Sequence, residues 1–128
     1  MEHEQIRRPV THYRDLIVWQ RAIELAEESQ RITARARWSR GRSFRDQIER
    51  SSASIPANIA EGNGRQRLGD YLRYLSIANG SLMELETHFE LARRLGLFST
   101  GDVTRASEMC DEVSRLLRAL MKALAKLR

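Results

Sequence analysis

The side chains best suited to binding a ligand are arginines clustered in residues 31–50. That segment holds seven arginines and two acids, so it accounts for the whole formal net charge of +5, while the remaining residues balance at 15 basic and 15 acidic. Guanidinium groups bind phosphates through paired hydrogen bonds and stack on bases, and clustered positive charge favours polyanions. We therefore predict a nucleic-acid-binding surface made of Arg35, Arg37, Trp38, Arg40, Arg42 and Arg45, with Arg65 and Arg67 as a second group.

Two alternatives to this surface stay open. The cluster is also compatible with a solvated loop between helix ends, in which the charges bind nothing. Trp38 is placed to stack on an unpaired base, but it could equally pack against the end of the domain.

A carboxylate-bridged metal site is the enzymatic arrangement to consider in a helical protein. Such sites use inward carboxylates from four helices, with Glu-x-x-His pairs on two of them. The nearest pattern is Glu84-x-Glu86-x-His88, where Glu84 and His88 are four residues apart, and no second pair exists. We predict no metal and no cofactor.

The sequence contains one cysteine, Cys110, so an intrachain disulfide is impossible. A catalytic cysteine needs a histidine partner, and the sequence does not place any histidine beside it. Cys110 falls in an apolar helical pattern, which predicts a small buried hydrophobic side chain. We therefore expect no catalytic residue and a non-enzymatic protein.

A set of polar residues surrounds a proline in the middle of the chain. Glu61 and Arg65 have the i,i+4 spacing of a helical ion pair. The side-chain amide of Asn58 is placed to bond to carbonyls that Pro56 leaves without a donor. We predict a structural polar network that fixes the packing geometry, formed by Arg50, Asn58, Glu61 and Glu86.

Glycine and proline divide the chain into four segments with helical periodicity. We predict a disordered tail over residues 1–12 and helices over about 13–36, 43–64, 68–95 and 102–127. Gly96 is expected to end the third helix, and Thr100 or Asp102 to cap the start of the fourth.

The last two helices have regular apolar stripes with alternating steps of three and four residues, the pattern of helices packed nearly parallel to their neighbours. In the third helix the stripe is Leu68, Leu72, Leu75, Ala78, Leu82, Leu85, Phe89 and Ala92. In the fourth it is Val103, Ala106, Cys110, Val113, Leu117, Leu120, Leu124 and Leu127.

The first two helices are less regular. For the first we predict a buried face of Leu16, Trp19, Ile23, Ala26 and Thr33. For the second, Ser43 and Asp46 resemble a cap, Pro56 is expected to kink the helix, and serines keep its middle small. Its apolar face is Phe44, Ile48, Ile55 and Ile59.

These elements predict one all-α domain, an antiparallel up-down-up-down four-helix bundle. In that topology residues 37–43 and 97–100 share one end and residues 63–67 lie at the other. No apolar run approaches the ~18 residues of a membrane span, and the N-terminus has no hydrophobic signal segment. We expect a cytoplasmic protein without membrane contact.

Three stretches together resemble a known family, the 23S rRNA-intervening-sequence proteins, also called four helix bundle proteins. They are Tyr13-Arg14-Asp15-Leu16-Ile17-Val18-Trp19-Gln20, the second-helix run from Asp46 to Gly62 that ends in Asn-Ile-Ala-Glu-Gly, and the third-helix run from Leu75 to Thr87. The resemblance covers about Tyr13 to Leu124. It departs between the first two helices, where residues 35–42 replace a Phe-Pro-x-x-Glu-like stretch with extra arginines.

The resemblance implies a four-helix bundle that forms homo-oligomeric rings, commonly pentamers. Some members are encoded inside insertions of bacterial 23S rRNA genes. A similar protein, the accessory variability protein of diversity-generating retroelements, binds nucleic acid and a reverse transcriptase. Two hypotheses follow: a homo-oligomer that binds structured RNA or DNA, or a scaffold for another polypeptide that exposes Leu97, Phe98 and Trp38.

Overall fold

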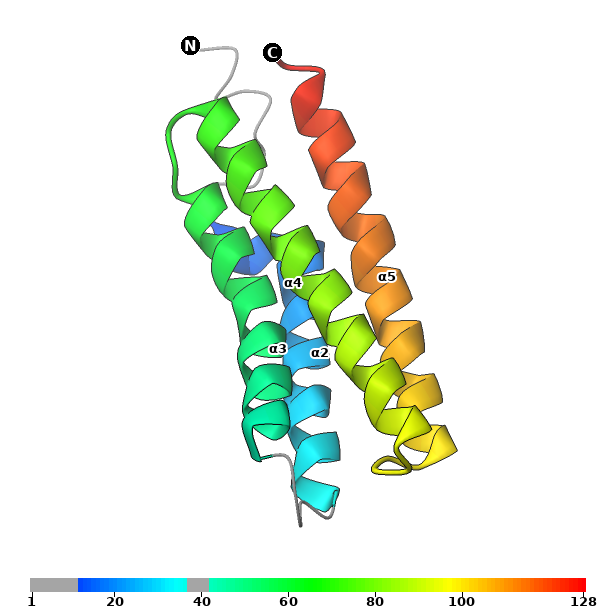
Figure 1. Ribbon diagram of the computed structural model, residues 1–128. Helices are drawn as coiled ribbons and strands as arrows, with labels where there is room; N and C mark the ends of the chain where they lie inside the picture. Colours follow the sequence, from blue (N-terminus) through cyan, green and yellow to red (C-terminus); the bar gives the residue numbers. More distant parts are fainter. Residues whose placement is uncertain (1–11, 37–41) are drawn as a thin grey trace.

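The computed structural model describes residues 12–36 and 42–128, apart from the side chains of residues 42–44. A short 3-10 turn, η1 (Tyr13–Asp15), precedes four long helices: α2 (Ile17–Arg35), α3 (Arg42–Asn63), α4 (Leu68–Arg94) and α5 (Thr100–Ala125). The helices alternate in direction, and the C-terminus lies at the same end as the α3–α4 turn (Figure 1). The predicted all-α up-down bundle is confirmed.

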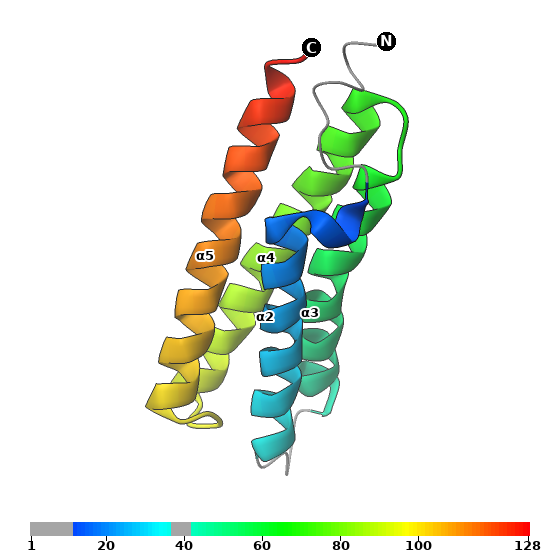
Figure 2. The same ribbon diagram turned by 180° about the vertical axis from the view of Figure 1, so that it is seen from behind.

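Each helix packs against its neighbours in the sequence, and α2 closes the bundle by packing against α5. Within the described residues, neither diagonal pair, α2 with α4 or α3 with α5, is in contact. Seen from the opposite side, α2 lies between α3 and α5 with η1 crossing its start (Figure 2). α2 and α4 therefore have outer faces on opposite sides of the molecule.

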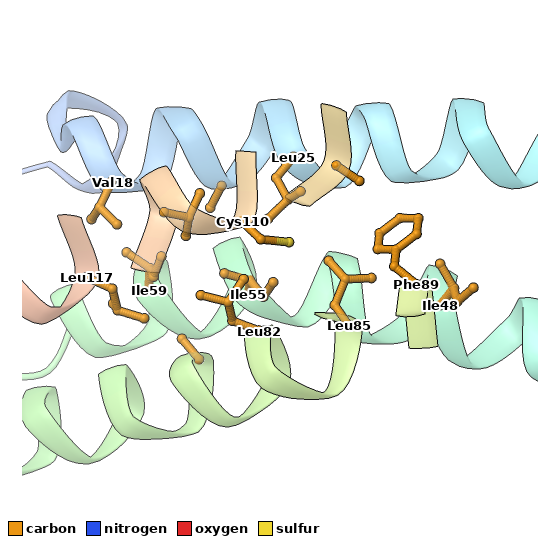
Figure 3. Packing of buried hydrophobic residues seen from close by; sticks show 14 of the residues in the cluster. Val18, Leu25, Ile48, Ile55, Ile59, Leu82, Leu85, Phe89, Cys110 and Leu117 are labelled. Carbon is orange, nitrogen blue, oxygen red and sulfur yellow. The ribbon is translucent and has the colours of Figure 1, made fainter. Parts of the chain in front are cut away.

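The cores of α4 and α5 follow the predicted stripes. Leu75, Leu82 and Leu85 of α4 and Val113 and Leu117 of α5 are almost completely buried, and they meet the isoleucines of α3 in one cluster (Figure 3). The outer members of both stripes, Leu68, Leu72, Leu120 and Leu127, are partly buried against the same cluster.

The buried face of α2 differs from the prediction. Val18, Ala22, Leu25 and Ile32 are the buried apolar residues of this helix, whereas Ile23 is 39% exposed. Of the predicted face, Thr33 is buried, and Leu16, Trp19 and Ala26 are half-buried. Val18, Ala22, Leu25 and Ile32 recur at helical spacing on one face, and the predicted face lies next to it on the same side of the helix.

The side chains in the middle of α3 are small, as predicted from its serines. Ser51 and Ser52 are buried, and their hydroxyls donate to helix carbonyls at Ile48 and Glu49. Pro56 lies inside the helix, which continues without interruption to Asn63. The predicted cap at Ser43 falls outside the described side chains, and the predicted tail falls almost entirely outside the described residues.

Two positions near helix ends require glycine, Gly62 for close packing and Gly96 for its backbone conformation. A Cβ added to Gly62 would lie 2.8 Å from Cβ of Tyr74 and 3.2 Å from the carbonyl oxygen of Tyr71, so glycine allows α3 to approach α4 closely. Gly96, at φ +74°, ends α4 as predicted, and the amide of Leu97 donates to the carbonyl of Ala92 across this turn.

The start of α5 differs from the prediction. Its cap is Ser99, one residue before Thr100, and its side chain accepts a hydrogen bond from the amide of Asp102. At the other end of the sequence, residues 13–15 form the separate turn η1, so the first long helix begins at Ile17.

Candidate nucleic-acid interface

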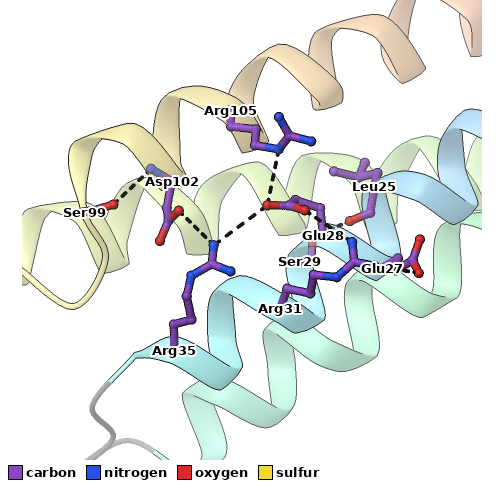
Figure 4. A network of polar contacts seen from close by, with 9 residues as sticks. All are labelled: Leu25, Glu27, Glu28, Ser29, Arg31, Arg35, Ser99, Asp102 and Arg105. Atoms are coloured by element: carbon purple, nitrogen blue, oxygen red, sulfur yellow. Dashed lines mark hydrogen bonds and ion pairs between the residues drawn. The ribbon is translucent and has the colours of Figure 1, made fainter.

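Arg35 of the predicted patch is engaged in a polar network between α2 and α5 (Figure 4). Its guanidinium lies 2.9 Å from the carboxylate of Asp102 and 3.8 Å from that of Glu28. Glu28 is only 8% exposed, and it also pairs with Arg31 at 3.5 Å and Arg105 at 3.3 Å. Three arginines thus surround one buried carboxylate, and Arg35 of the predicted patch links α2 to α5 through it and through Asp102.

Arg45 is also paired. Its Nε donates to the carboxylate of Glu49 at 3.0 Å, and the hydroxyl of Thr33 donates to the same carboxylate across the α2–α3 seam. The remaining residues of the patch, Arg37, Trp38 and Arg40, lie outside the described residues. Arg42 begins α3, but its side chain is not described.

The second predicted group lies at the α3–α4 turn. Arg65 donates to the carboxylate of Glu61 at 2.8 Å and to the hydroxyl of Tyr74 at 2.7 Å. The guanidiniums of Arg65 and Arg73 both lie 4.8 Å from the centroid of the Tyr74 ring. Arg67 precedes α4 as its N-cap residue, is exposed, and has no ion pair within the described part of the chain.

The most concentrated positive charge on the described surface is one that the sequence analysis missed. Residues 113–128 contain five basic residues and no acid, whereas residues 100–112 contain four acids and one arginine. Four of the five basic residues follow helical spacing along the outward face of α5, and all are exposed. We call this set the α5 basic stripe: Arg115, Arg118, Lys122 and Lys126.

The stripe is open to a ligand. None of its four side chains forms an ion pair within the residues that the structure describes; the only hydrogen bond there is from Nε of Arg118 to the carbonyl of Ser114. Arg128 lies close to Gly69 at the start of α4, so positive charge continues from the stripe toward Arg67. The stripe was missed because whole-chain counting cancels it against the acidic first half of α5; a windowed charge count would have found it.

The predicted polar network is divided into separate groups. The side-chain amide of Asn58 donates to the carbonyl and hydroxyl of Ser54, whose hydroxyl bonds to that of Ser81 on α4 at 2.8 Å. Glu61 belongs to the Arg65 group one turn further on. Arg50 is exposed and has no hydrogen bond or ion pair to the other three members in the described chain.

Glu86 lies on the opposite side of α4, against α5. Burial and the neighbouring Asp111 raise the pKa of its carboxyl group. It lines a groove of about 220 Å³ between α4 and α5 together with Phe89, Glu90, Val103, Ser107 and Cys110. Among the described side chains no arginine pairs with Glu86, so this residue is separate from the Glu61–Arg65 group.

Cys110 is 1% exposed at the base of this groove. Burial and the charges of Glu86 and Asp111 raise the pKa of its thiol to about 12. Because the thiolate is the nucleophilic form, this thiol is a poor nucleophile. The environment matches the predicted small buried hydrophobic side chain.

The Glu84-x-Glu86-x-His88 pattern brings two of its side chains together. Nε2 of His88 lies 3.5 Å from the carboxylate of Glu84, while Glu86 points toward α5. In the described residues, no three side chains of the histidine, cysteine, aspartate and glutamate types gather closely enough to hold a metal ion. None of the described helices is long and apolar enough to cross a membrane.

Comparison with known proteins gives a matching family and similar solved structures. The model of the family described as 23S rRNA-intervening sequence protein matches residues 14–119. A crystal structure of a protein of unknown function, from the S23 ribosomal protein family of Bacteroides thetaiotaomicron VPI-5482, is similar at a TM-score of 0.75 and 25% identity. The similarity covers 83% of this chain and 99% of that one. No curated protein matches.

Proposed function

Because this chain belongs to the 23S rRNA-intervening sequence protein family, we propose that it is a non-enzymatic, homo-oligomeric bundle that binds structured RNA or DNA through phosphates. The family's name associates it with a ribosomal RNA insertion. The fold supplies long, rigid helices that display charge at fixed spacing. Phosphate contacts alone are enough for such binding, because most protein–nucleic-acid hydrogen bonds go to the backbone and sugar.

One observation carries this proposal: within the described residues, the exposed cations in the second half of α5 form no ion pair. Arg35, Arg45 and Arg65 each pair with a carboxylate, and a ligand phosphate would have to compete with that carboxylate. Glu108 and Asp111 line a groove with Arg115 and Arg118 at the start of the α5 basic stripe, but neither acid forms an ion pair with them. A polyanion that binds the stripe therefore breaks no ion pair of the described residues.

Self-association is supported by exposed apolar side chains on two opposite helices. On α4, Ile77, Met83 and Leu91 are between 40% and 57% exposed, and on α2 Ile17 and Ile23 are 52% and 39% exposed. Since α2 and α4 do not touch within one chain, contact between α4 of one copy and α2 of the next is head-to-tail. Such contacts close into a ring when the rotation allows, which agrees with the pentamer that the family resemblance implies.

A ring would repeat the basic stripe around its rim. Several weak phosphate contacts on one rigid particle then act together, which raises the overall affinity without any new contact. This explains how a chain with a modest net charge of +5 can hold a nucleic acid.

The proposal is tested by electrophoretic shift of total cellular RNA together with light scattering of the free protein. We expect a shift at low salt and a mass several times the 14.8 kDa of the chain. A monomeric mass would contradict the oligomer, and the absence of any shift would contradict nucleic-acid binding.

The second candidate is a scaffold for another polypeptide, supported by the same exposed face of α4. Of the residues first predicted to mediate it, Phe98 is buried with its ring against Phe89, and Leu97 is half-buried. Trp38 lies outside the described residues. Capture from a native extract with and without nuclease separates the candidates, since a polypeptide partner stays bound after nuclease treatment.

A further inference from the structure

The α5 basic stripe has a regular spacing that bears on its ligand. Its cations stand at positions 115, 118 and 122 of α5 and at its C-cap residue 126, so the row extends about 16 Å along the helix axis at 1.5 Å per residue. A double helix carries one phosphate charge per about 1.7 Å of its axis when both strands are counted. A straight row of this length can therefore meet several phosphates of a duplex at once.

The side chains beside the stripe are small. Ala119 and Ala123 are exposed on the same half of α5, and they allow a flat or convex surface to approach the helix backbone. Residues 113–128 contain no aromatic residue and no asparagine or glutamine. Proteins that hold single strands combine cations with aromatic side chains on which bases stack, and adenine edges are recognised by side-chain amides, whereas guanine edges are recognised by Arg or Lys.

From this composition and geometry we infer that the α5 basic stripe binds the phosphate backbone of double-helical nucleic acid, without base stacking. This inference rests on the proposed nucleic-acid binding and names the surface and the form of the ligand. Affinity at the stripe follows phosphate density. A duplex is therefore bound more tightly than a single strand of the same length.

The test uses fluorescence anisotropy of the full chain with a short mixed-sequence RNA duplex, the matching DNA duplex and one separated strand. The variant Arg115→Gln, Arg118→Gln, Lys122→Gln, Lys126→Gln removes the stripe. The matched control changes four exposed arginines elsewhere, Arg14, Arg50, Arg93 and Arg94, to glutamine, which gives the same net charge. Helical circular dichroism checks that both variants fold.

We expect the stripe variant to bind duplexes at least about tenfold more weakly, and its plot of log affinity against log salt to lose about three to four units of slope. The control variant should keep most of the duplex affinity and most of the salt slope. A charge-preserving variant, Arg115→Lys with Arg118→Lys, should also keep the slope, because counterion release depends on charge and not on guanidinium geometry.

The outcomes distinguish a failure of this inference from a failure of the proposed nucleic-acid binding. If the unaltered chain binds no nucleic acid, the proposed function itself is overturned. If it binds but the stripe variant and the control lose affinity equally, the stripe is not the site and nucleic-acid binding stands. Tighter binding to the single strand, or equal competition by polyglutamate, would overturn the duplex as ligand.

Discussion

Arg35 of α2 and Asp102 of α5 form an ion pair of 2.9 Å across the bundle. The same guanidinium reaches the buried carboxylate of Glu28, which also contacts Arg31 and Arg105. The pairing ties the end of the first helix to the start of the last, helices that lie far apart in the sequence. It gives an arginine from the charged segment a structural role in addition to its charge.

Glu28 is expected to contribute to stability through this network. The variant Glu28→Gln leaves three guanidiniums around a neutral side chain, and we expect the free energy of unfolding to fall by about 1–2 kcal/mol, because hydrogen bonds to charged groups are worth more than neutral ones. The change is limited to this size because the arginines are half-exposed or more and water screens their charge. Urea unfolding measures the change.

The neighbouring residue provides the control for this prediction. Glu27 pairs with Arg31 in an exposed i,i+4 geometry, so Glu27→Gln should change the unfolding free energy by less than about 0.5 kcal/mol. Equal effects from the two variants would show that the network around Glu28 is no stronger than a surface ion pair.

Gly62 is expected to be required for the packing of α3 against α4. In Gly62→Ala the new methyl group would lie 2.8 Å from Cβ of Tyr74, and relieving that overlap should destabilise the fold by about 1–3 kcal/mol despite the better helix propensity of alanine. The midpoint of thermal unfolding of Gly62→Ala, compared with that of the unaltered chain, measures this loss of stability. Gly101→Ala, where a Cβ meets nothing within 4 Å, should be neutral or slightly stabilising, and the idea fails if both variants behave alike.

The thiol of Cys110 is expected to be unreactive in the folded chain. Its pKa is raised from 9.0 to about 12, chiefly by burial, so alkylation at pH 8 should proceed only as the protein unfolds. Because the folded pKa lies above the unfolded one, the stabilisation from keeping this thiol neutral is complete below pH 9 and declines between about pH 9 and 12.

The pH dependence has a direct check. The difference in unfolding free energy between the unaltered chain and Cys110→Ala should shrink across that alkaline range and stay constant below it. Rapid alkylation of the folded protein at neutral pH, or a constant difference up to pH 12, would contradict the assignment.

The exposed face of α4 is expected to mediate self-association. Met83→Glu combined with Leu91→Glu places two charges on apolar positions that are 57% and 47% exposed, and the mass from light scattering should fall to that of a monomer. The control, Ala34→Glu with Thr104→Glu at other exposed helical positions, should keep the oligomer. Retention of the full mass by the α4 variant would rule this face out.

Much of the fold could be predicted from sequence, because α4 and α5 each have a single apolar stripe. Gly96 separates these two helices at the predicted point. For α2 the predicted face is displaced from the buried one, because Trp19 and Ile23 lie beside the stripe of Val18, Ala22, Leu25 and Ile32 and the prediction places them at its centre. The burial of Glu28 on this helix could not be predicted, because its partner Arg105 belongs to α5.

The candidate site was predictable only in part. The sequence predicts that positive charge is the relevant property of the site, but it does not show which arginines have carboxylate partners. Arg35 and Asp102 are 67 residues apart in the chain, so their pairing emerges only in the folded bundle. The stripe on α5 was hidden because acids in the preceding turns cancel it in any whole-chain count.

The most direct test of phosphate-mediated binding is the salt dependence of the affinity for a structured RNA, measured by anisotropy between about 50 and 200 mM salt. We predict that log affinity falls linearly with log salt with a slope of about −3 or steeper, as expected when several cations displace counterions from phosphates. No binding at the lowest salt, or an affinity that does not change with salt, would contradict it.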